Sequence, residues 1–402
     1  MDGHERDDVV EYRNRVFLPA ITQFESRMAK LVLNEETGEL KKIMPEVVDD
    51  QPRIIIQYHD ESCFHANDEA RSLWLQAGEQ PLRKKSRDRL IHVSDFINEE
   101  DGRLVLLDQD GNILRDARKI IYPGSNGDAW WDNEQLMAQI RSAIEIFEAA
   151  HPDCQALFIF DQSSAHASLP PDALRAFEMN KSNGGKQRMQ RDTIIPQSNS
   201  DPHFCGQPQS MTTASGEAKG LQAVLEERGF DVSRLRAKCS PVCPIESQNC
   251  CMARLLSQQE DFINQESMLE TLIKEKGHFC LFLPKFHCEL NPIEMVSSDP
   301  VNFITMLIYK SKYWGWCKYR YQEYPKATFS EAKECAHEVL DACPKEVIQR
   351  FINRSWRFID SYKKGLTGEA AAWVVKKQKG HRAVSDKAMK ALEARSKGKK
   401  VV

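Results

Sequence analysis

Three carboxylates follow short apolar segments of this 402-residue chain. They are Asp60 after the run 53–58, Asp161 after the run 156–160 and Glu294 after the run 278–283. Apolar, β-branched runs of this length predict buried strands. Carboxylates at adjacent strand ends and at the opening of a helix can converge, and three can hold two Mg²⁺ ions roughly 3.5–4 Å apart for phosphoryl transfer. A chain with 59 acidic residues offers many such triples, so the pattern depends on its flanking residues.

The segment between the first two carboxylates predicts the elements that would position them. Asp-Gly pairs at 101–102 and 110–111 lie between apolar runs, which indicates hairpins between Ile91 and Tyr122. Asp132 is expected to cap a helix with apolar residues on one face. The order strand, hairpins, helix and strand indicates an α/β fold.

The later part of the chain alternates between polar and helical patterns. Residues 181–217 are rich in Gly, Pro, Ser, Asn and Gln and predict a long polar insertion, while 218–229 and 250–275 look helical. Thr328 and Glu331 form a capping box for a helix to about Ala342. Pro344 then begins another helix, which Gly365 ends.

Composition excludes several classes of protein. No apolar stretch is long enough to span a membrane, and the acidic start lacks a signal-peptide segment. The 12 irregularly spaced Cys favour a reducing compartment over a disulfide framework. A net charge of −4 argues against nucleic-acid binding, but residues 376–402 hold ten basic and two acidic side chains. That tail fits a polyanion partner or an import signal, and the alternative is a solvated terminus.

The residues around the three carboxylates resemble the signature blocks of the DDE transposases. The blocks are Tyr58 to Ser62, Phe160 to His166, and Leu283 to Glu294 with its Asn-Pro-Ile-Glu ending. The pattern is similar to that of the mariner/pogo-related group and its fungal relatives, the DDE superfamily endonucleases, over about residues 50–365. Two features depart from the family: Gln162 replaces the usual Asn, and the spacings between the carboxylates are longer.

The resemblance implies a ribonuclease-H-like fold, a mixed sheet flanked by helices. It implies that Asp60, Asp161 and Glu294 are catalytic and bind two Mg²⁺ or Mn²⁺ ions, with Glu61 and His166 beside them. It also implies double-stranded DNA as the partner, the nucleus as the location and no membrane, and it leaves a homodimer open. The expected DNA contacts are Lys318, Arg320, Lys376, Lys377, Lys379 and Arg382.

A segment of 17 residues, Val296 to Lys312, separates Asn-Pro-Ile-Glu-Met from a Trp-rich segment that begins at Tyr313. In the family these two segments are nearly adjacent. The segment begins Val-Ser, which GTAAGT can encode, and ends in Lys, whose codon can end in AG. We therefore hypothesise a retained intron translated in frame; the alternative is a loop insertion. Either would interrupt the helix expected to hold Glu294.

The expected organisation is one interrupted catalytic core with appendages. The parts are an acidic leader at 1–50, a core at 51–180 and 276–365, a polar and Cys-rich helical insertion at 181–275, the segment 296–312 and a basic tail at 366–402. The leader is too short and too acidic for paired helix-turn-helix domains, which suggests a truncated element.

Other candidate sites have simpler interpretations. Cys239, Cys243, Cys250 and Cys251, with His278 and Cys280 downstream, could bind structural Zn²⁺, but no clean C-x-x-C pair is present and buried free thiols are favoured. Trp130, Trp131, Trp314 and Trp316 could stack on bases, but core packing is favoured.

Two functions therefore follow from the sequence. The first is a metal-dependent DNA endonuclease that also transfers strands. The second is a catalytically inactive transposase relic that at most binds nucleic acid. A third, weaker interpretation is a zinc-stabilised interaction domain.

Overall fold

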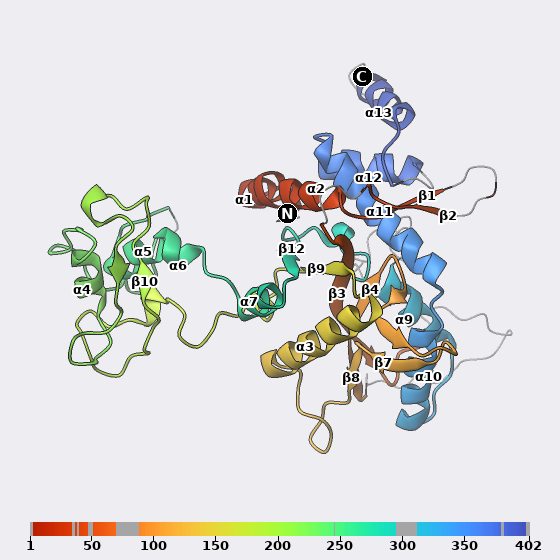
Figure 1. Cartoon of the computed structure of the whole chain (residues 1–402), viewed down its shortest axis with the longest axis horizontal. Coiled ribbons are helices and arrows are strands. Elements are labelled where there is room, and N and C mark those ends of the chain that lie inside the picture. Colours follow the sequence, from red (N-terminus) through yellow and green to blue (C-terminus); the bar gives the residue numbers. More distant parts are fainter. Residues whose placement is uncertain are drawn as a thin grey trace, which may run out of the picture. The chain divides into compact units, whose positions relative to one another are not determined.

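The computed structural model describes residues 3–33, 37, 40–46, 51–69, 88–244, 246–294, 312–378 and 382–398. The chain forms two compact units, drawn in Figure 1. Unit 1 comprises Met1–His166 and Leu272–Val402, and unit 2 comprises Ala167–Thr271. Among the described residues, no helix combines the length and the apolar character needed to cross a bilayer.

A mixed sheet forms the centre of unit 1. Its strands are β3 (Arg53–His65), β4 (Leu90–Asn98), β5 (Gly102–Arg103), β8 (Lys119–Ile121), β9 (Cys154–Phe160) and β12 (Phe279–Phe282). The order is β12-β9-β3-β4-β5, with β8 also paired to β4. The first three strands are parallel, whereas β4 is antiparallel to β3, β5 and β8. This order with these directions is that of a ribonuclease-H-like sheet, so the predicted fold class is confirmed.

Strand β3 is longer than the apolar run predicts. Residues 53–58 pair with β9, Tyr58 also pairs with β4, and residues 59–65 pair with β4 alone. Asp60 therefore lies inside a strand, just past the point where pairing with β9 stops. Because side chains alternate along a strand, Asp60 and Glu61 point to opposite faces of the sheet.

The helix α3 (Asn133–Ala150) covers the face to which Glu61 points. As predicted, the Asp132 side chain caps it by accepting a hydrogen bond from the Gln135 N–H at 2.9 Å. Gln139 on this helix accepts a hydrogen bond from the Ser94 hydroxyl of β4 at 2.7 Å. The turn after β4 and the hairpin β6 (Val105–Leu107) with β7 (Ile113–Asp116) are also as predicted, with positive φ at the glycines of both Asp-Gly pairs.

Other helices pack in the core on the Asp60 face. They are α9 (Tyr313–Glu323), α10 (Phe329–Asp341) and α11 (Lys345–Lys363). Trp314 and Tyr321 of α9 lie against Phe64 of β3, edge to face. The predicted capping box is present, since the Glu331 N–H donates to Thr328 Oγ1 at 3.2 Å. Gly365 follows α11 with a φ of 75°.

The residues expected as an acidic leader also contribute to unit 1. They form η1 (Gly3–Glu5), α1 (Asp7–Tyr12), η2 (Arg13–Phe17), α2 (Leu18–Glu25), β1 (Lys30–Leu33) and β2 (Leu40–Ile43). Phe17 and Ile21 are fully buried in the same core as β3 and α11. The remaining elements of unit 1 are η5 (Cys288–Leu290), α12 (Gly368–Lys377) and α13 (Asp386–Gly398).

Unit 2 has short elements joined by long connections. They are η3 (Ala176–Glu178), β10 (Thr193–Ile194), η4 (Pro202–Phe204), β11 (Pro208–Gln209), α4 (Leu221–Glu226), α5 (Met252–Ser257) and α6 (Glu260–Ile263), and α7 (Met268–Glu275) begins in it. Its core contains Leu221, Leu225, Leu256 and Phe262. Unit 2 is thus a folded body that overlaps most of the range 181–275 expected as an insertion and begins before it, at Ala167.

Candidate active site

The parallel pairing of β3 with β9 aligns the first two predicted carboxylates. Tyr58 is the register partner of Ile159, and the same offset, carried two residues further, sets Asp60 beside Asp161. The pairing of Phe282 with Phe160 and the Leu283 N–H bond to the Phe160 carbonyl bring the end of β12 to the same edge. The carboxyl ends of three parallel strands therefore meet where the sequence predicts a metal site.

Asp60 lies in an environment that disfavours its charged form. Burial raises its pKa well above the usual value, and the charges of Glu294, Glu61 and Asp161 raise it further. The indole N–H of Trp314 donates to Asp60 Oδ2 at 3.0 Å, and Asp60 Oδ1 takes no part in this bond. A buried carboxylate surrounded by other carboxylates is a suitable ligand for a divalent cation, because the cation compensates the repulsion.

Asp161 and Glu61 are instead stabilised as anions by one imidazole. His166 Nδ1 lies 2.5 Å from Asp161 Oδ1, and its Nε2 lies 3.6 Å from Glu61 Oε1. Burial lowers the pKa of His166, but these two carboxylates outweigh burial and raise it to about 10. Burial likewise raises the pKa of Glu61, but the bond to His166 outweighs it and the pKa falls to about 2. His166 is thus a buried cation that holds two acidic side chains in place.

Glu294 lies in a turn that is attached to β3 beside Asp60. The Asn291 side-chain N–H donates to the His59 carbonyl at 3.2 Å. Burial raises the pKa of Glu294, and the nearby ammonium of Lys312 opposes this. Residues 291–294 are not themselves helical, the residues in which the predicted helix would continue lie outside the described ones, and the next described helix begins at Tyr313. The chain between them, 295–311, lies outside the described residues, as does most of the segment 296–312.

Backbone bonds between the residues before Glu294 and those at the start of α9 follow the α-helical pattern. The Tyr313 N–H donates to the Pro292 carbonyl at 3.3 Å, and the Trp314 N–H donates to the Ile293 carbonyl at 3.2 Å. In an unbroken α-helix each N–H bonds to the carbonyl four residues earlier. Tyr313 and Trp314 therefore occupy the places of residues 296 and 297 in a helix that starts at the Glu294 turn, with 17 residues of chain in excess.

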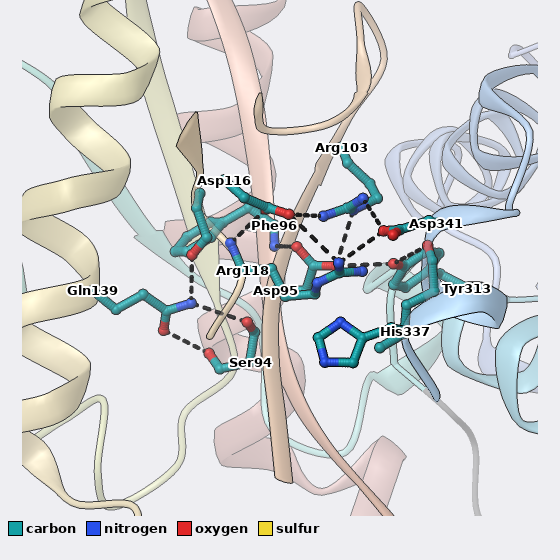
Figure 2. Close-up of polar contacts among 12 residues, drawn as sticks. Ser94, Asp95, Phe96, Arg103, Asp116, Arg118, Gln139, Tyr313, His337 and Asp341 are labelled. Atoms are coloured by element: carbon teal, nitrogen blue, oxygen red, sulfur yellow. Dashed lines mark hydrogen bonds and ion pairs between the residues drawn. The ribbon is translucent and has the colours of Figure 1, made fainter. Parts of the chain in front are cut away.

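A buried polar network attaches the start of α9 to the sheet (Figure 2). The Tyr313 hydroxyl donates to Asp95 Oδ2 at 2.9 Å. Asp95 is the register partner of Asp60 across β4 and β3, so the first two residues of α9 contact two adjacent acidic residues of the sheet. Arg103 lies 3.5 Å from Asp95 and donates to Asp341 of α10 at 2.8 Å. These long-range contacts fix α9, and with it Trp314, next to Asp60.

The three predicted ligands do not form one tight cluster. Among the described residues, three groups bring at least three possible ligand atoms within 4.8 Å of one another, and Asp60, Asp161 and Glu294 are not one of them. Three carboxylates that share two ions need not all approach one another this closely, since each ion touches a different pair. Their mutual effect on pKa nevertheless links Asp60 to both Asp161 and Glu294.

The expected DNA contacts differ in how accessible they are. Lys376 and Lys377 are exposed on α12. Lys318 is half-buried near the Phe64 ring, and burial lowers its pKa. Arg320 is half-buried too, with its guanidinium 3.6 Å from the Trp316 ring centre.

Arg382 does not fit the predicted role in DNA contact. It is 8% exposed, its guanidinium lies 3.4 Å from the Trp356 ring centre, and it donates to the Ala29 carbonyl at 3.1 Å. Its charge therefore faces the interior, where the nearest carboxylate is that of Glu99 at 3.8 Å. Lys379, also predicted as a DNA contact, lies outside the described residues.

Sequence reasoning missed the two indoles as partners of the site. Trp314 is fully buried and donates to Asp60, while Trp131 donates to Glu61 at 3.1 Å. Trp130, in contrast, is 66% exposed. The expected preference for core packing holds for Trp314, but the indole N–H groups of Trp314 and Trp131 also orient carboxylates. The only signal in the sequence was the position of Trp314 after the Asn-Pro-Ile-Glu block.

Solved structures similar to this chain are complexes of the Mos1 mariner transposase. A Mos1 mariner paired end complex with Mn is 10% identical over 87% of this chain and 60% of its own, with a TM-score of 0.36. A Mos1 transposase paired-end complex with left transposon end is 9% identical over 94% of this chain and 64% of its own, with a TM-score of 0.33. The chain thus spans less than two thirds of these transposase chains. No protein-family model and no curated protein matches the chain.

Proposed function

We propose that unit 1 is a transposase-like DDE endonuclease domain that cleaves DNA phosphodiesters and transfers the resulting ends. The observation that carries this proposal is the β3–β9 register that aligns Asp60 with Asp161, at the edge where Asn291 holds the Glu294 turn. These residues are the three carboxylates of the signature blocks. Double-stranded DNA is the proposed substrate, with the nucleus as the location and a homodimer as the working assembly.

Asp60, Asp161 and Glu294 are the proposed ligands of two Mg²⁺ or Mn²⁺ ions. Bound ions of this kind activate water and stabilise the attacking and leaving oxygens in phosphoryl transfer. The residues fit that role, because oxygen ligands suit these cations, and because burial and then the charges of three neighbouring carboxylates raise the pKa of Asp60. His166 orients Asp161 and Trp314 orients Asp60, which fixes the direction of the two carboxylates.

Nicking of supercoiled plasmid tests the proposal. The full chain is incubated with Mg²⁺ or Mn²⁺ and compared with Asp161→Asn, which keeps the shape of the side chain and removes its charge. We expect the variant to lose at least about 100-fold in nicking rate, in keeping with the loss of an electrostatic catalytic group. Asp153→Asn is the matched control, because Asp153 is exposed before the start of β9. Equal nicking by wild type and Asp161→Asn would remove the assigned role.

A second function, an inactive relic that binds nucleic acid, is favoured by one observation. The ammonium of Lys312 opposes the rise in the pKa of Glu294 and thus competes with a cation for this carboxylate, and the inserted segment 296–312 follows Glu294 almost directly in the sequence. Salt-dependent DNA binding without nicking by the wild type, with either ion, would support this function over the first.

A further inference from the structure

Four cysteines of unit 2 converge on one point. The sulfur atoms of Cys239, Cys243, Cys250 and Cys251 all lie within 4.8 Å of one another. Cys251 is fully buried and Cys243 is 9% exposed, and both belong to the core of the unit. The four are free thiols rather than disulfides, and the Cys243 and Cys251 sulfurs are 3.7 Å apart. Sequence spacing favoured separate buried thiols, whereas the fold brings all four together.

We propose that these four cysteines form a structural Zn²⁺ site. Zinc bonds to thiolates at about 2.3 Å in a tetrahedron, which places the sulfurs of neighbouring ligands roughly 3.8 Å apart. The separation of the Cys243 and Cys251 sulfurs matches this value. Mg²⁺ and Ca²⁺ prefer oxygen ligands, and the close approach of all four sulfurs leaves room for one ion rather than a cluster.

The surrounding backbone supports a preformed site. The N–H of Arg254 donates to the Cys251 sulfur at 3.5 Å, the type of bond that stabilises a metal-bound thiolate. The N–H groups of Met252 and Ala253 donate to the carbonyls of Arg236 and Ala237 at 3.0 Å each. These two bonds join the segment before Cys239 to the segment after Cys251. The ligands are therefore positioned by main-chain bonds as well as by packing.

The short helices and strands of unit 2 are a second reason to expect a stabilising metal ion. Its helices within 167–271 are six residues or shorter and its strands have two residues each, among the described residues. Short elements of this kind bury little apolar surface, and small loop-rich domains are commonly stabilised by a metal or disulfides. His278 and Cys280, considered with this group from the sequence, belong to unit 1 and are not ligands. The zinc site is independent of the proposed endonuclease activity.

Metal content of the purified full chain tests the proposal. We expect one equivalent of zinc per chain, which falls to less than about a tenth in Cys243→Ser and in Cys251→Ser. Cys205→Ser is the matched control, because Cys205 is a cysteine of unit 2 outside the cluster and should leave zinc unchanged. Cys239→Ser should also lose zinc, whereas Cys239→His should retain it with a Cys₃His ligand set, a difference that a purely structural effect would not produce.

Thiol alkylation of the folded wild type keeps the test valid if a variant fails to fold. We expect the four proposed ligands to be protected from alkylation while zinc is bound and to react when a chelator removes it. Removal of zinc should also make unit 2 sensitive to protease. Metal-free protein that stays unreactive and protease-resistant, two disulfides in place of the thiols, iron in place of zinc, or equal zinc loss in Cys205→Ser would each overturn the proposal.

Discussion

Asp60 and Glu61 are adjacent in sequence and opposite in their electrostatics. Burial and neighbouring carboxylates raise the pKa of Asp60, whereas Glu61 on the other face receives the Trp131 N–H and the His166 charge and has a pKa of about 2. The strand alternation alone creates this difference. At the residue scale, the protein already stabilises the charged form of Glu61, whereas the charged form of Asp60 is disfavoured. A bound cation would therefore stabilise Asp60 more than Glu61.

The raised pKa of Asp60 predicts that its carboxylate lowers the stability of the metal-free protein and raises it when a metal ion is bound. A carboxyl whose folded pKa is raised destabilises the fold above its usual pKa of 3.8, and this cost disappears as the pH falls below the raised value. Without metal, Asp60→Asn should therefore raise the free energy of unfolding at pH 7, because the amide has no charged form to be disfavoured by burial and by the neighbouring carboxylates.

Denaturant unfolding with and without Mn²⁺ measures both the stability of the metal-free protein and the stability gained from the ion. Wild type should gain stability with Mn²⁺, and Asp60→Asn should lose most of that gain. The stability difference between the two proteins without metal should shrink on acidification. A variant that is less stable at pH 7 and still responds fully to Mn²⁺ would contradict the assignment of Asp60 as a ligand.

At the scale of elements, the main feature is the helical bonding between the residues before Glu294 and the start of α9. The carbonyls of Pro292 and Ile293 accept from Tyr313 and Trp314 in helical phase, although 17 residues of chain separate the two halves. For any connection without structure of its own, the dependence on (3/2)RT ln n makes the closure of 17 residues cost roughly 2.5 kcal/mol plus a constant. The same segment ends in Lys312, whose charge lies near Glu294.

Deletion of residues 296–312 should therefore join the two halves into one helix. Met295 would be followed directly by Tyr313, and Glu294 would lie in the first turn without Lys312 beside it. We expect a higher melting temperature by several degrees, since about 1 kcal/mol shifts the melting point of a large domain by ~2–4 °C. Nicking should also increase at least several-fold.

Deletion of residues 298–312 is the matched control, because it leaves two extra residues. Each residue turns an α-helix by about 100°, so the halves would meet about 200° out of phase. This variant should be less stable than the 17-residue deletion. Equal stability of the two deletions would show that phase does not matter. The related intron hypothesis is tested by the mature transcript across codons 295–313, where retention of the segment would contradict it.

Elements were easier to predict than the contacts between them. Apolar runs, Asp-Gly turns and the caps at Asp132 and Thr328 identified strands and helices, because these signals are local. The bond from Tyr313 to Asp95 spans 218 positions and carries no pattern that a sequence reveals. The burial of Arg382 against Trp356 was missed for the same reason, since a basic residue in a basic tail looks exposed. The convergence of the cysteines likewise arises from loops rather than from spacing.

For the whole molecule, the net charge of −4 conceals a local excess of basic residues. Lys376 and Lys377 are exposed on α12, whereas Arg382 from the same tail is buried. The number of tail charges that can reach a phosphate is thus smaller than the sequence count of ten.

This arrangement predicts how DNA affinity depends on salt. Each phosphate contact contributes about −0.9 to the slope of log K against log salt for duplex DNA. Replacing both Lys376 and Lys377 by Ala should reduce the slope by up to about 2 in a fluorescence-anisotropy titration. Replacing the exposed Lys181 and Lys186 of unit 2 by Ala gives the same change in net charge and should leave the slope nearly unchanged. Equal slopes for wild type and the Lys376/Lys377 variant would exclude α12 as a DNA contact.

The contacts that hold α9 have a consequence for how the polypeptide can be made. Trp314 bonds to Asp60, Tyr313 bonds to Asp95, and the backbone of both bonds to the turn before Glu294, so none of these contacts requires the peptide chain between 294 and 313. Two separate polypeptides, 1–294 and 313–402, should therefore assemble when produced together. The protein would then be a natural starting point for a split, two-fragment system in which the association of the fragments completes the carboxylate site.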